Sequence, residues 1–219
     1  MRPATLTAIL SLTTIGALAA APVLADNHAA PQTPGAMDVA RVTAGTYATD
    51  PAHTLVGWRV DHFGFNDYFG TFGDAEGTLT IDPADPEAAQ VDVTLPITSV
   101  SVVSKGLRDH LLRPGSDGGD PDFFGPEPAP ARFVSDGVTI YGTGTKALVS
   151  GNLTLNGRTN PVVIEAKFTG AGKNPRSQVE TIGFEGEFSI NRSDFGIDYA
   201  IPLVGDEVGL TISVAFEKQ

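Results

Sequence analysis

The chain has 219 residues, a hydrophobic content of 41% and a formal net charge of −12, values typical of a globular protein with one moderate domain or two small ones. It contains no cysteine, which excludes thiol catalysis, thiolate metal sites and disulfide bonds. The acidic balance provides no basic stripe that could neutralise phosphates, so we expect no nucleic-acid partner.

The N-terminus has the three-part pattern of a secretory signal peptide. Arg2 precedes an apolar run without a charged residue before Asp26, and the run closes in small residues. We expect residues 1–25 to be the signal peptide, with cleavage after Ala25, and residues 17–19 as a second candidate cleavage signal. An uncleaved membrane anchor is the alternative, but the Thr, Ser and Pro content of the run favours cleavage.

Residues 26–45 are rich in Ala, Pro and Gly, and their apolar residues follow neither the helical nor the strand period. This composition predicts a disordered leader. From there on, apolar residues recur at every second position, the period of a half-buried strand. The expected strands cover roughly 56–60, 76–82, 91–97, 131–141, 147–155, 162–168, 182–190 and 208–216. We therefore predict an all-β domain over residues 46–219, with roughly eight antiparallel strands in a barrel or sandwich.

Two local signals refine this prediction. Asn156-Gly157 tolerates the positive φ angles of a tight hairpin. One short helix is expected near Ser104 to Leu112, followed by a Gly- and Pro-rich loop over 113–130.

Eight strands can close into a barrel with room for one small ligand. The large inward apolar side chains would then either form a solid core or line an apolar cavity, and the pattern does not choose between these.

Catalytic motifs are scarce. The chain has neither the Gly-x-Ser-x-Gly turn of serine hydrolases nor the His-Glu-x-x-His pair of metalloproteases. His53 and His62 are nine positions apart, so on a straight strand they point to opposite faces and do not predict a shared metal.

Three polar groupings remain as candidates for function: His62 after its strand, Arg108 to His110 in the short helix, and Arg192 with Asp194. On residue types alone, a structural ion pair or a cap explains each of them at least as well as a functional site does.

A set of motifs in fixed order resembles the YceI-like family from about Thr46 to Glu217. The motifs are Tyr47-x-x-Asp50-Pro51-x-His53-Thr54, Val60-x-His62-x-Gly64, Gly70-x-Phe72, Leu107-Arg108-Asp109, Asp122-Phe123-Phe124, Arg132-Phe133-x-Ser135, Gly151-x-Leu153-Thr154-Leu155-x-Gly157-x-Thr159-x-Pro161 and Arg192-Ser193-Asp194-Phe195-Gly196. The resemblance implies an exported, commonly periplasmic, lipocalin-like barrel. Its apolar cavity would hold a polyisoprenoid chain or a similar amphiphile such as a quinone, without a metal or another cofactor.

The resemblance also suggests which residues bind the ligand: Trp58, Val60, His62, Phe65, Phe72, Arg108, His110, Phe123, Phe124, Arg192, Asp194 and Phe195. Arg108 and Arg192 are candidates for a diphosphate or quinone oxygen, because a guanidinium group can donate two parallel hydrogen bonds. The Phe-Gly run after His62 is expected to bend its strand and shape the cavity wall. Residues 113–121 are an insertion relative to the family pattern, which puts ligand size and head group in question.

We therefore expect a non-catalytic carrier that sequesters an isoprenoid lipid or quinone and contacts a membrane transiently. The alternative is an exported enzyme that uses His62, His110 and nearby carboxylates on a lipid or small substrate. A third reading is a stress-response scaffold whose barrel is packed solid. The family resemblance leaves a homodimer open, although no exposed apolar stripe in the sequence marks an interface.

Overall fold

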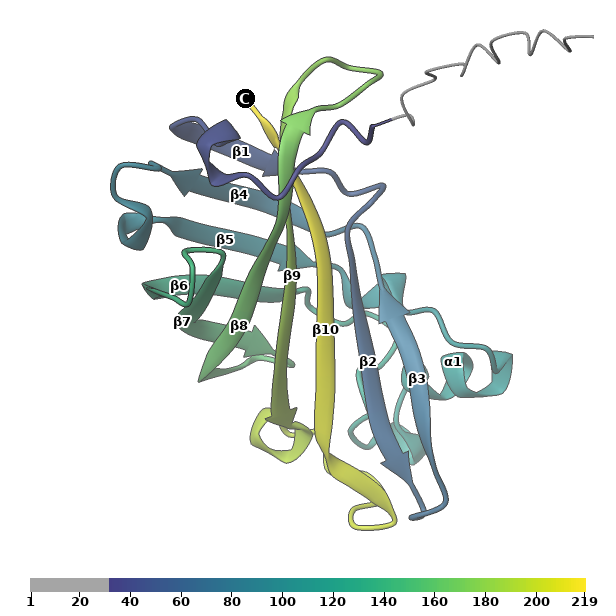
Figure 1. Cartoon of the computed structure of the whole chain (residues 1–219). Helices are drawn as coiled ribbons and strands as arrows, with labels where there is room; N and C mark the ends of the chain where they lie inside the picture. The colour runs from purple at the N-terminus through teal and green to yellow at the C-terminus, as the bar shows by residue number, and fades with distance from the viewer. Residues whose placement is uncertain (1–31) are drawn as a thin grey trace, which may run out of the picture. The chain divides into compact units, whose positions relative to one another are not determined.

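Antiparallel strands form a sheet that closes on itself (Figure 1). The computed structural model describes residues 32–219, and Thr33–Gln219 form one compact unit. The strands in this part of the chain are β1 (Gly45–Thr49), β2 (Leu55–His62), β3 (Asn66–Phe72), β4 (Glu76–Ile81), β5 (Gln90–Leu95), β6 (Ala131–Tyr141), β7 (Lys146–Leu155), β8 (Arg158–Lys173), β9 (Glu180–Asn191) and β10 (Val204–Lys218).

The barrel closes because β1 pairs with both β4 and β10. The closed ring runs β1-β4-β5-β6-β7-β8-β9-β10, which confirms the predicted eight-stranded antiparallel barrel. The β2–β3 hairpin extends this ring, because β2 pairs with β10 beyond the end of β1. Since β1 and β2 follow the same edge of β10, they are two halves of one strand that is interrupted at residues 50–54.

Strand β3 follows a tight turn at the place where we expected the strand of His62 to bend. Phe63 and Gly64 have φ angles of 62° and 70°, and the resulting tight turn reverses the chain so that Trp58 pairs with Gly70. The far edge of β3 is bridged at Thr71 to Ser101. The Phe-Gly run therefore reverses the chain completely, because both turn residues are left-handed, and Phe63, Tyr68 and Phe72 of this hairpin line the cavity wall.

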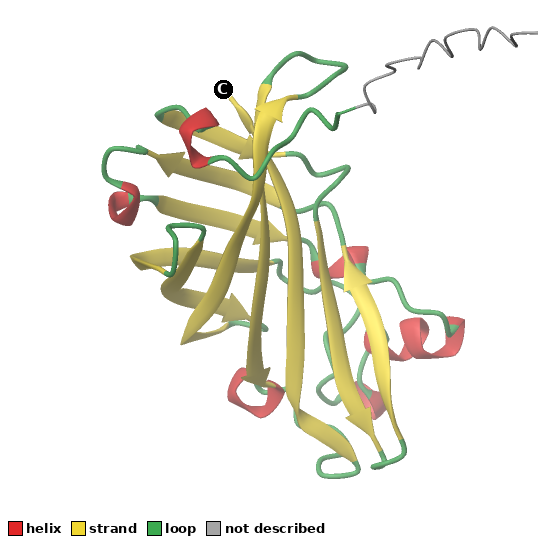
Figure 2. Cartoon of the chain, viewed as in Figure 1, coloured by secondary structure: helices red, strands yellow, loops and turns green. Residues whose placement is uncertain are grey.

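The short helix α1 (Lys105–Leu111) confirms the predicted helix. It begins after Ser104, whose hydroxyl accepts a hydrogen bond from the backbone N–H of Leu107. Short 3-10 helices lie before β1 and in the connections between later strands (Figure 2). These are η1 (Val39–Arg41), η2 (Pro86–Ala88), η3 (Ile97–Ser99), η4 (Ser116–Gly118) and η5 (Arg192–Phe195).

The predicted hairpin turn between β7 and β8 is also confirmed. Asn156 and Gly157 have φ angles of 50° and 75°, which are the two left-handed residues of a tight hairpin. The Asn156 side chain donates a hydrogen bond to the carbonyl of Phe195, 3.1 Å away. The turn is therefore tied to η5 at the same end of the barrel.

Two hydrophobic clusters leave the middle of the barrel unfilled. The first joins β1 to strands β4, β8, β9 and β10, and consists of Tyr47, Leu79, Phe168, Ala171, Ile182 and Phe216. The second packs η3 and α1 against β3 and β6, and consists of Phe72, Ile97, Val100, Leu111 and Ala131. Burial of these side chains supplies much of the driving force for folding.

Part of the expected leader packs on the barrel. The backbones of Ala36 and Ala171 exchange two hydrogen bonds, of 3.1 and 2.9 Å, which place this segment against β8. The expected signal peptide, residues 1–25, and the adjoining residues 26–31 lie outside the described residues. Within residues 32–219, no helix has both the length and the apolar character needed to cross a membrane.

Candidate functional site

The inside of the barrel is a cavity of about 790 Å³. Val204 and then alternate residues of β10 from Val208 to Phe216 line it, and this regular part corresponds to about 26 Å of extended strand. Facing residues of β5 to β9 complete the wall, and they include Val93, Val138, Val149, Ile164 and Phe188. The inward apolar side chains therefore line a long cavity, and the sequence alone had left this choice open.

Strand β2 presents Trp58, Val60 and His62 to the cavity. The Trp58 indole lies over Gly70 of β3, where even a Cβ atom would overlap the ring. It also stacks on Tyr68, with 6.4 Å between ring centroids and 19° between planes. The absence of a side chain at Gly70 thus allows the Trp58 ring to lie flat against the inner wall.

Two polar atoms of the cavity wall have no hydrogen-bond partner among the described residues, Thr54 Oγ1 and Trp58 Nε1. Both are buried, and an unsatisfied buried donor costs about 1–3 kcal/mol. The cavity lining as a whole is mostly apolar. Both atoms are themselves closed off from open space, so a ligand oxygen could reach them only after a neighbouring side chain moved.

The cavity reaches the surface at the turn between β2 and β3. Phe63, Tyr199 and Leu203 line the cavity and are also exposed. The backbone N–H of Phe63 donates a hydrogen bond of 2.8 Å to the carbonyl of Leu203. The His62 ring packs against Phe63, with 4.1 Å between centroids. These contacts define the mouth of the cavity.

A polar cluster joins α1 to the inserted loop beside this mouth. His110 Nε2 lies 2.7 Å from Asp122 Oδ2, and Arg113 donates to the same oxygen at 2.6 Å. The hydrogen bonds from Arg113 and then from His110 hold the pKa of the Asp122 carboxyl below its ordinary value. His110 also packs edge-to-face on Phe123 and on Tyr199, with centroid distances of 5.1 and 5.2 Å.

Arg192 borders the cavity as a structural group. Its side chain is 5% exposed and donates to the carbonyls of Gly205, Ile197 and Val204 at 2.8, 2.9 and 3.0 Å. Burial lowers the pKa of Arg192, and the charges of two nearby carboxylates oppose this effect. The guanidinium group therefore holds η5 to the start of β10. Arg192 and Asp194 both lie in η5, and no ion pair joins their side chains.

The structure brings most of the predicted ligand-binding residues to the cavity wall: Trp58, Val60, His62, Phe72, His110, Phe123, Phe124 and Arg192. The other predicted residues lie outside its lining. Phe65 is 88% exposed and Phe195 is buried in the protein, while Asp194 is exposed on η5. Arg108 donates to the carbonyls of Val100 and Thr98, so it fastens α1 to the preceding segment.

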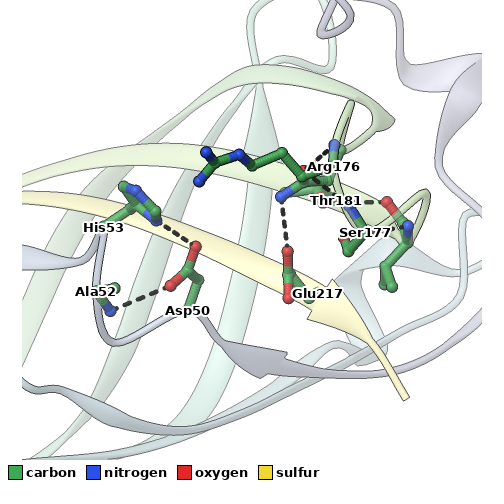
Figure 3. Close-up of polar contacts among 9 residues, drawn as sticks. Asp50, Ala52, His53, Arg176, Ser177, Thr181 and Glu217 are labelled. Carbon is green, nitrogen blue, oxygen red and sulfur yellow. Dashed lines mark hydrogen bonds and ion pairs between the residues drawn. The ribbon is translucent and has the colours of Figure 1, made fainter.

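His53 lies in the interruption between β1 and β2 rather than on the strand of His62. Its Nδ1 atom is 2.6 Å from Asp50 Oδ2, and the other carboxylate oxygen accepts from the N–H of Ala52 (Figure 3). Residues 32–219 contain no group of three or more His, Cys, Asp or Glu side chains that could hold a metal ion.

Sequence reasoning missed Tyr68, Tyr199 and Leu203 at the cavity. The alternation of Tyr68, Gly70 and Phe72 could have indicated the inward face of β3. Tyr199 and Leu203 lie in an irregular connection, where no period marks the side chains that face inward.

Comparison with known proteins identifies the family. A family model described as the YceI-like domain matches residues 47–216. The chain belongs to the YceI-like family. A YceI-like relative, the Escherichia coli protein YceI, is 38% identical over 168 residues, which are 76% of this chain and 83% of that protein. The UPF0312 protein of Ectopseudomonas mendocina is 37% identical over 179 residues, 80% of this chain and 89% of the relative.

Solved structures share the YceI-like fold. Burkholderia cenocepacia BcnA superposes with a TM-score of 0.62 at 23% identity, over 76% of this chain and 98% of that one. Campylobacter jejuni YceI superposes with a TM-score of 0.58 at 26% identity, over 73% of this chain and 90% of that one. A polyisoprenoid binding domain from Saccharophagus degradans, described as implicated in plant cell wall breakdown, superposes with a TM-score of 0.53 at 13% identity. The superposition covers 79% of this chain and 98% of that one.

Proposed function

We propose that this YceI-like protein is a non-catalytic carrier of an isoprenoid lipid or a similar long-chain amphiphile such as a quinone. The observation that carries this proposal is the apolar cavity of about 790 Å³ along β10. This volume lies within the range of small-molecule sites. The structural similarity to a polyisoprenoid binding domain supports an isoprenoid as the occupant.

The energetics are adequate for such binding. Each methylene buried contributes about 0.8 kcal/mol. A few isoprene units would thus offset the freedom that the ligand loses on binding. Release needs only a second apolar environment, so a carrier can work by partition without covalent chemistry.

The cavity favours an amphiphile with at least one oxygen atom. Thr54 Oγ1 and Trp58 Nε1 are buried and unpartnered in its wall, and His62 and Tyr199 lie near its mouth. A hydrocarbon tail fits the apolar length, while a carbonyl, hydroxyl or phosphate oxygen would satisfy one of these polar groups.

We further propose that residues 1–25 direct export to the periplasm and are removed after Ala25. The support is the charged start, apolar run and small-residue end of this segment. The intact mass of protein purified from the periplasm tests this proposal. A mature chain that starts at Asp26 is expected, and a chain that retains residues 1–25 would contradict it.

Native mass spectrometry of the gently purified mature protein tests the carrier proposal. We expect a stoichiometric polyprenyl species or quinone that organic extraction releases and identifies. The emptied protein is then titrated with prenols of increasing length, with fluorescence of Trp58, the single tryptophan of the chain, as the readout. Affinity should rise with tail length.

A bare protein that also refuses added prenols and quinones would overturn the carrier proposal. The same samples are assayed for chemical change of the ligand, with His62→Gln as the matched variant. Turnover by the wild type that His62→Gln abolishes, with ligand binding retained, would establish the enzyme alternative instead.

A further inference from the structure

Four exposed apolar side chains surround the mouth of the cavity. Phe63, Phe65, Tyr199 and Leu203 are 47%, 88%, 42% and 63% exposed, and we refer to them as the apolar rim. They come from two connections, the β2–β3 turn and the segment between η5 and β10. Both connections extend beyond the strands at the lower end of the barrel in Figure 1. The hydrogen bond from Phe63 to Leu203 holds the two connections together.

The apolar rim is continuous with the cavity. Phe63, Tyr199 and Leu203 belong both to the cavity wall and to the outer surface. Phe65 lies one residue beyond the left-handed turn and outside the cavity lining. Such a cluster of exposed aromatic and aliphatic side chains is characteristic of an interaction site.

The shape of the rim suits a bilayer better than a protein partner. A stable interface between two copies buries about 800 Å² on each partner, and the tips of two turns offer a narrow, projecting surface instead. Aromatic and aliphatic side chains on such a surface can enter the boundary between head groups and acyl chains. A tail that left the cavity here would pass directly into hydrocarbon without crossing water.

The charges beside the rim restrict the kind of membrane. Asp61 is exposed next to the β2–β3 turn and accepts a hydrogen bond of 2.9 Å from the N–H of Gly64. Asp198 is exposed beside Tyr199, and the whole chain has a net charge of −12. Carboxylates at this position would be repelled by anionic lipids. Neutral, zwitterionic head groups would carry no such penalty.

We propose that the apolar rim docks the barrel on the surface of a zwitterionic bilayer and places the cavity mouth against the acyl chains. This inference rests on the proposed carrier function, because it assigns the surface through which a lipid enters and leaves. It is carried by the four exposed side chains, by the position of Phe63, Tyr199 and Leu203 on both the rim and the cavity wall, and by the adjacent carboxylates.

Flotation of the mature protein with phosphatidylcholine vesicles tests the proposal. We expect the wild type to float with the vesicles and Phe65→Ser to bind about tenfold more weakly, the factor expected when one buried Phe is lost from an apolar environment. Phe69→Ser is the matched control, because Phe69 is 61% exposed on β3 but does not line the cavity or belong to the rim. It should bind like the wild type.

Vesicles with phosphatidylglycerol as an added component should bind the wild type less well. Equal flotation of the wild type and Phe65→Ser, or equal losses in Phe65→Ser and Phe69→Ser, would overturn the proposal. Stronger binding to the anionic vesicles would also overturn it. The ligand content of each sample is measured separately by native mass spectrometry. A wild type that carries no isoprenoid and refuses added prenols and quinones, but floats through Phe65, would therefore refute the carrier function alone.

Discussion

At the scale of single residues, Gly70 and Trp58 show how one position shapes the cavity wall. The indole of Trp58 occupies the space where a side chain at position 70 would begin. Protein interiors are packed closely enough that a single methyl group in the wrong place forces a rearrangement. Gly57, one residue before Trp58, has room for a methyl group, since a Cβ there would lie 3.7 Å from the carbonyl oxygen of Thr211, an ordinary contact distance.

We expect Gly70→Ala to destabilise the protein by about 1–3 kcal/mol, because the new methyl group must displace the Trp58 ring. The fluorescence of Trp58 should change as well, since the ring moves relative to Tyr68. Gly57→Ala is the matched control and should change stability by less than about 1 kcal/mol. Chemical denaturation followed by fluorescence measures both effects. Equal stability of the two variants would show that the ring does not depend on Gly70.

Arg192 is a second residue whose role was not visible from its neighbours in sequence. Its three hydrogen bonds reach carbonyl groups that lie 5, 12 and 13 residues away. Ser193 contributes further to the same junction, because its N–H and hydroxyl both donate to Asp206, at 2.9 and 2.7 Å. The Arg-Ser motif therefore fixes the connection that carries Tyr199 and Leu203 to the mouth.

At the scale of elements, α1 lines the cavity and is fastened through His110 to Arg113, the first residue of the insertion over residues 113–121. Their link is the acceptor oxygen of Asp122, which receives hydrogen bonds from Arg113 and lies next to His110. His110 in turn contacts Tyr199 across the mouth. The insertion thus adds a polar fastening to the wall that α1 provides, and it does so where a ligand would enter.

We expect the stabilising effect of this fastening to depend on pH. The pKa of Asp122 is lowered in the folded state, so its contribution is present above the ordinary value of 3.8 and is lost as pH falls through the lowered pKa. Asp122→Asn should therefore lower the melting temperature at about pH 6 and lower it by less at about pH 3. Circular dichroism of the wild type and the variant measures this difference.

Asp117→Asn, in the same insertion, is the control for the removal of one negative charge. The prediction would be contradicted if Asp122→Asn and the wild type melted together at both pH values. It would also be contradicted if their difference were larger in acid, because a group with a lowered pKa loses its contribution there.

At the scale of the whole molecule, the barrel has an interior that its side chains do not fill. The clusters around Tyr47 and around Ile97 are buried, and several of their side chains, among them Leu79, Phe216 and Leu111, also line the cavity. Small residues help to keep this space open. Ala147 and Ala166 pair with each other on β7 and β8, and both line the cavity.

We expect Ala147→Phe to weaken ligand binding by about tenfold or more, because the larger side chain takes up space that a lipid tail would occupy. Folding stability should change by less than about 2 kcal/mol, since the ring enters a cavity instead of a packed core. Leu148→Phe is the matched control, because Leu148 is an exposed neighbour on the outer face. Prenol titration and thermal unfolding measure both quantities. Undiminished binding by Ala147→Phe would place the ligand elsewhere.

The sequence by itself determined the local features of this protein. Alternating apolar residues predicted β2 and β4 to β10, because a half-buried strand needs a dry face and a wet face. Ser104 and Asn156-Gly157 marked a helix start and a hairpin, since capping and left-handed turns depend on adjacent residues. The order of the motifs also indicated the family that the comparison with known proteins then confirmed.

Only the tertiary structure decided which side chains meet around the cavity. The interruption between β1 and β2, the hairpin to β3 and the closure of β1 onto β10 depend on pairing between distant segments. For the same reason Arg108 and Arg192, which sequence reasoning assigned to a ligand head group, bind backbone carbonyls in the structure. Whether a barrel interior is solid or hollow depends on the total volume of the side chains that all its strands direct inward. The apolar pattern of a single strand does not give that total volume.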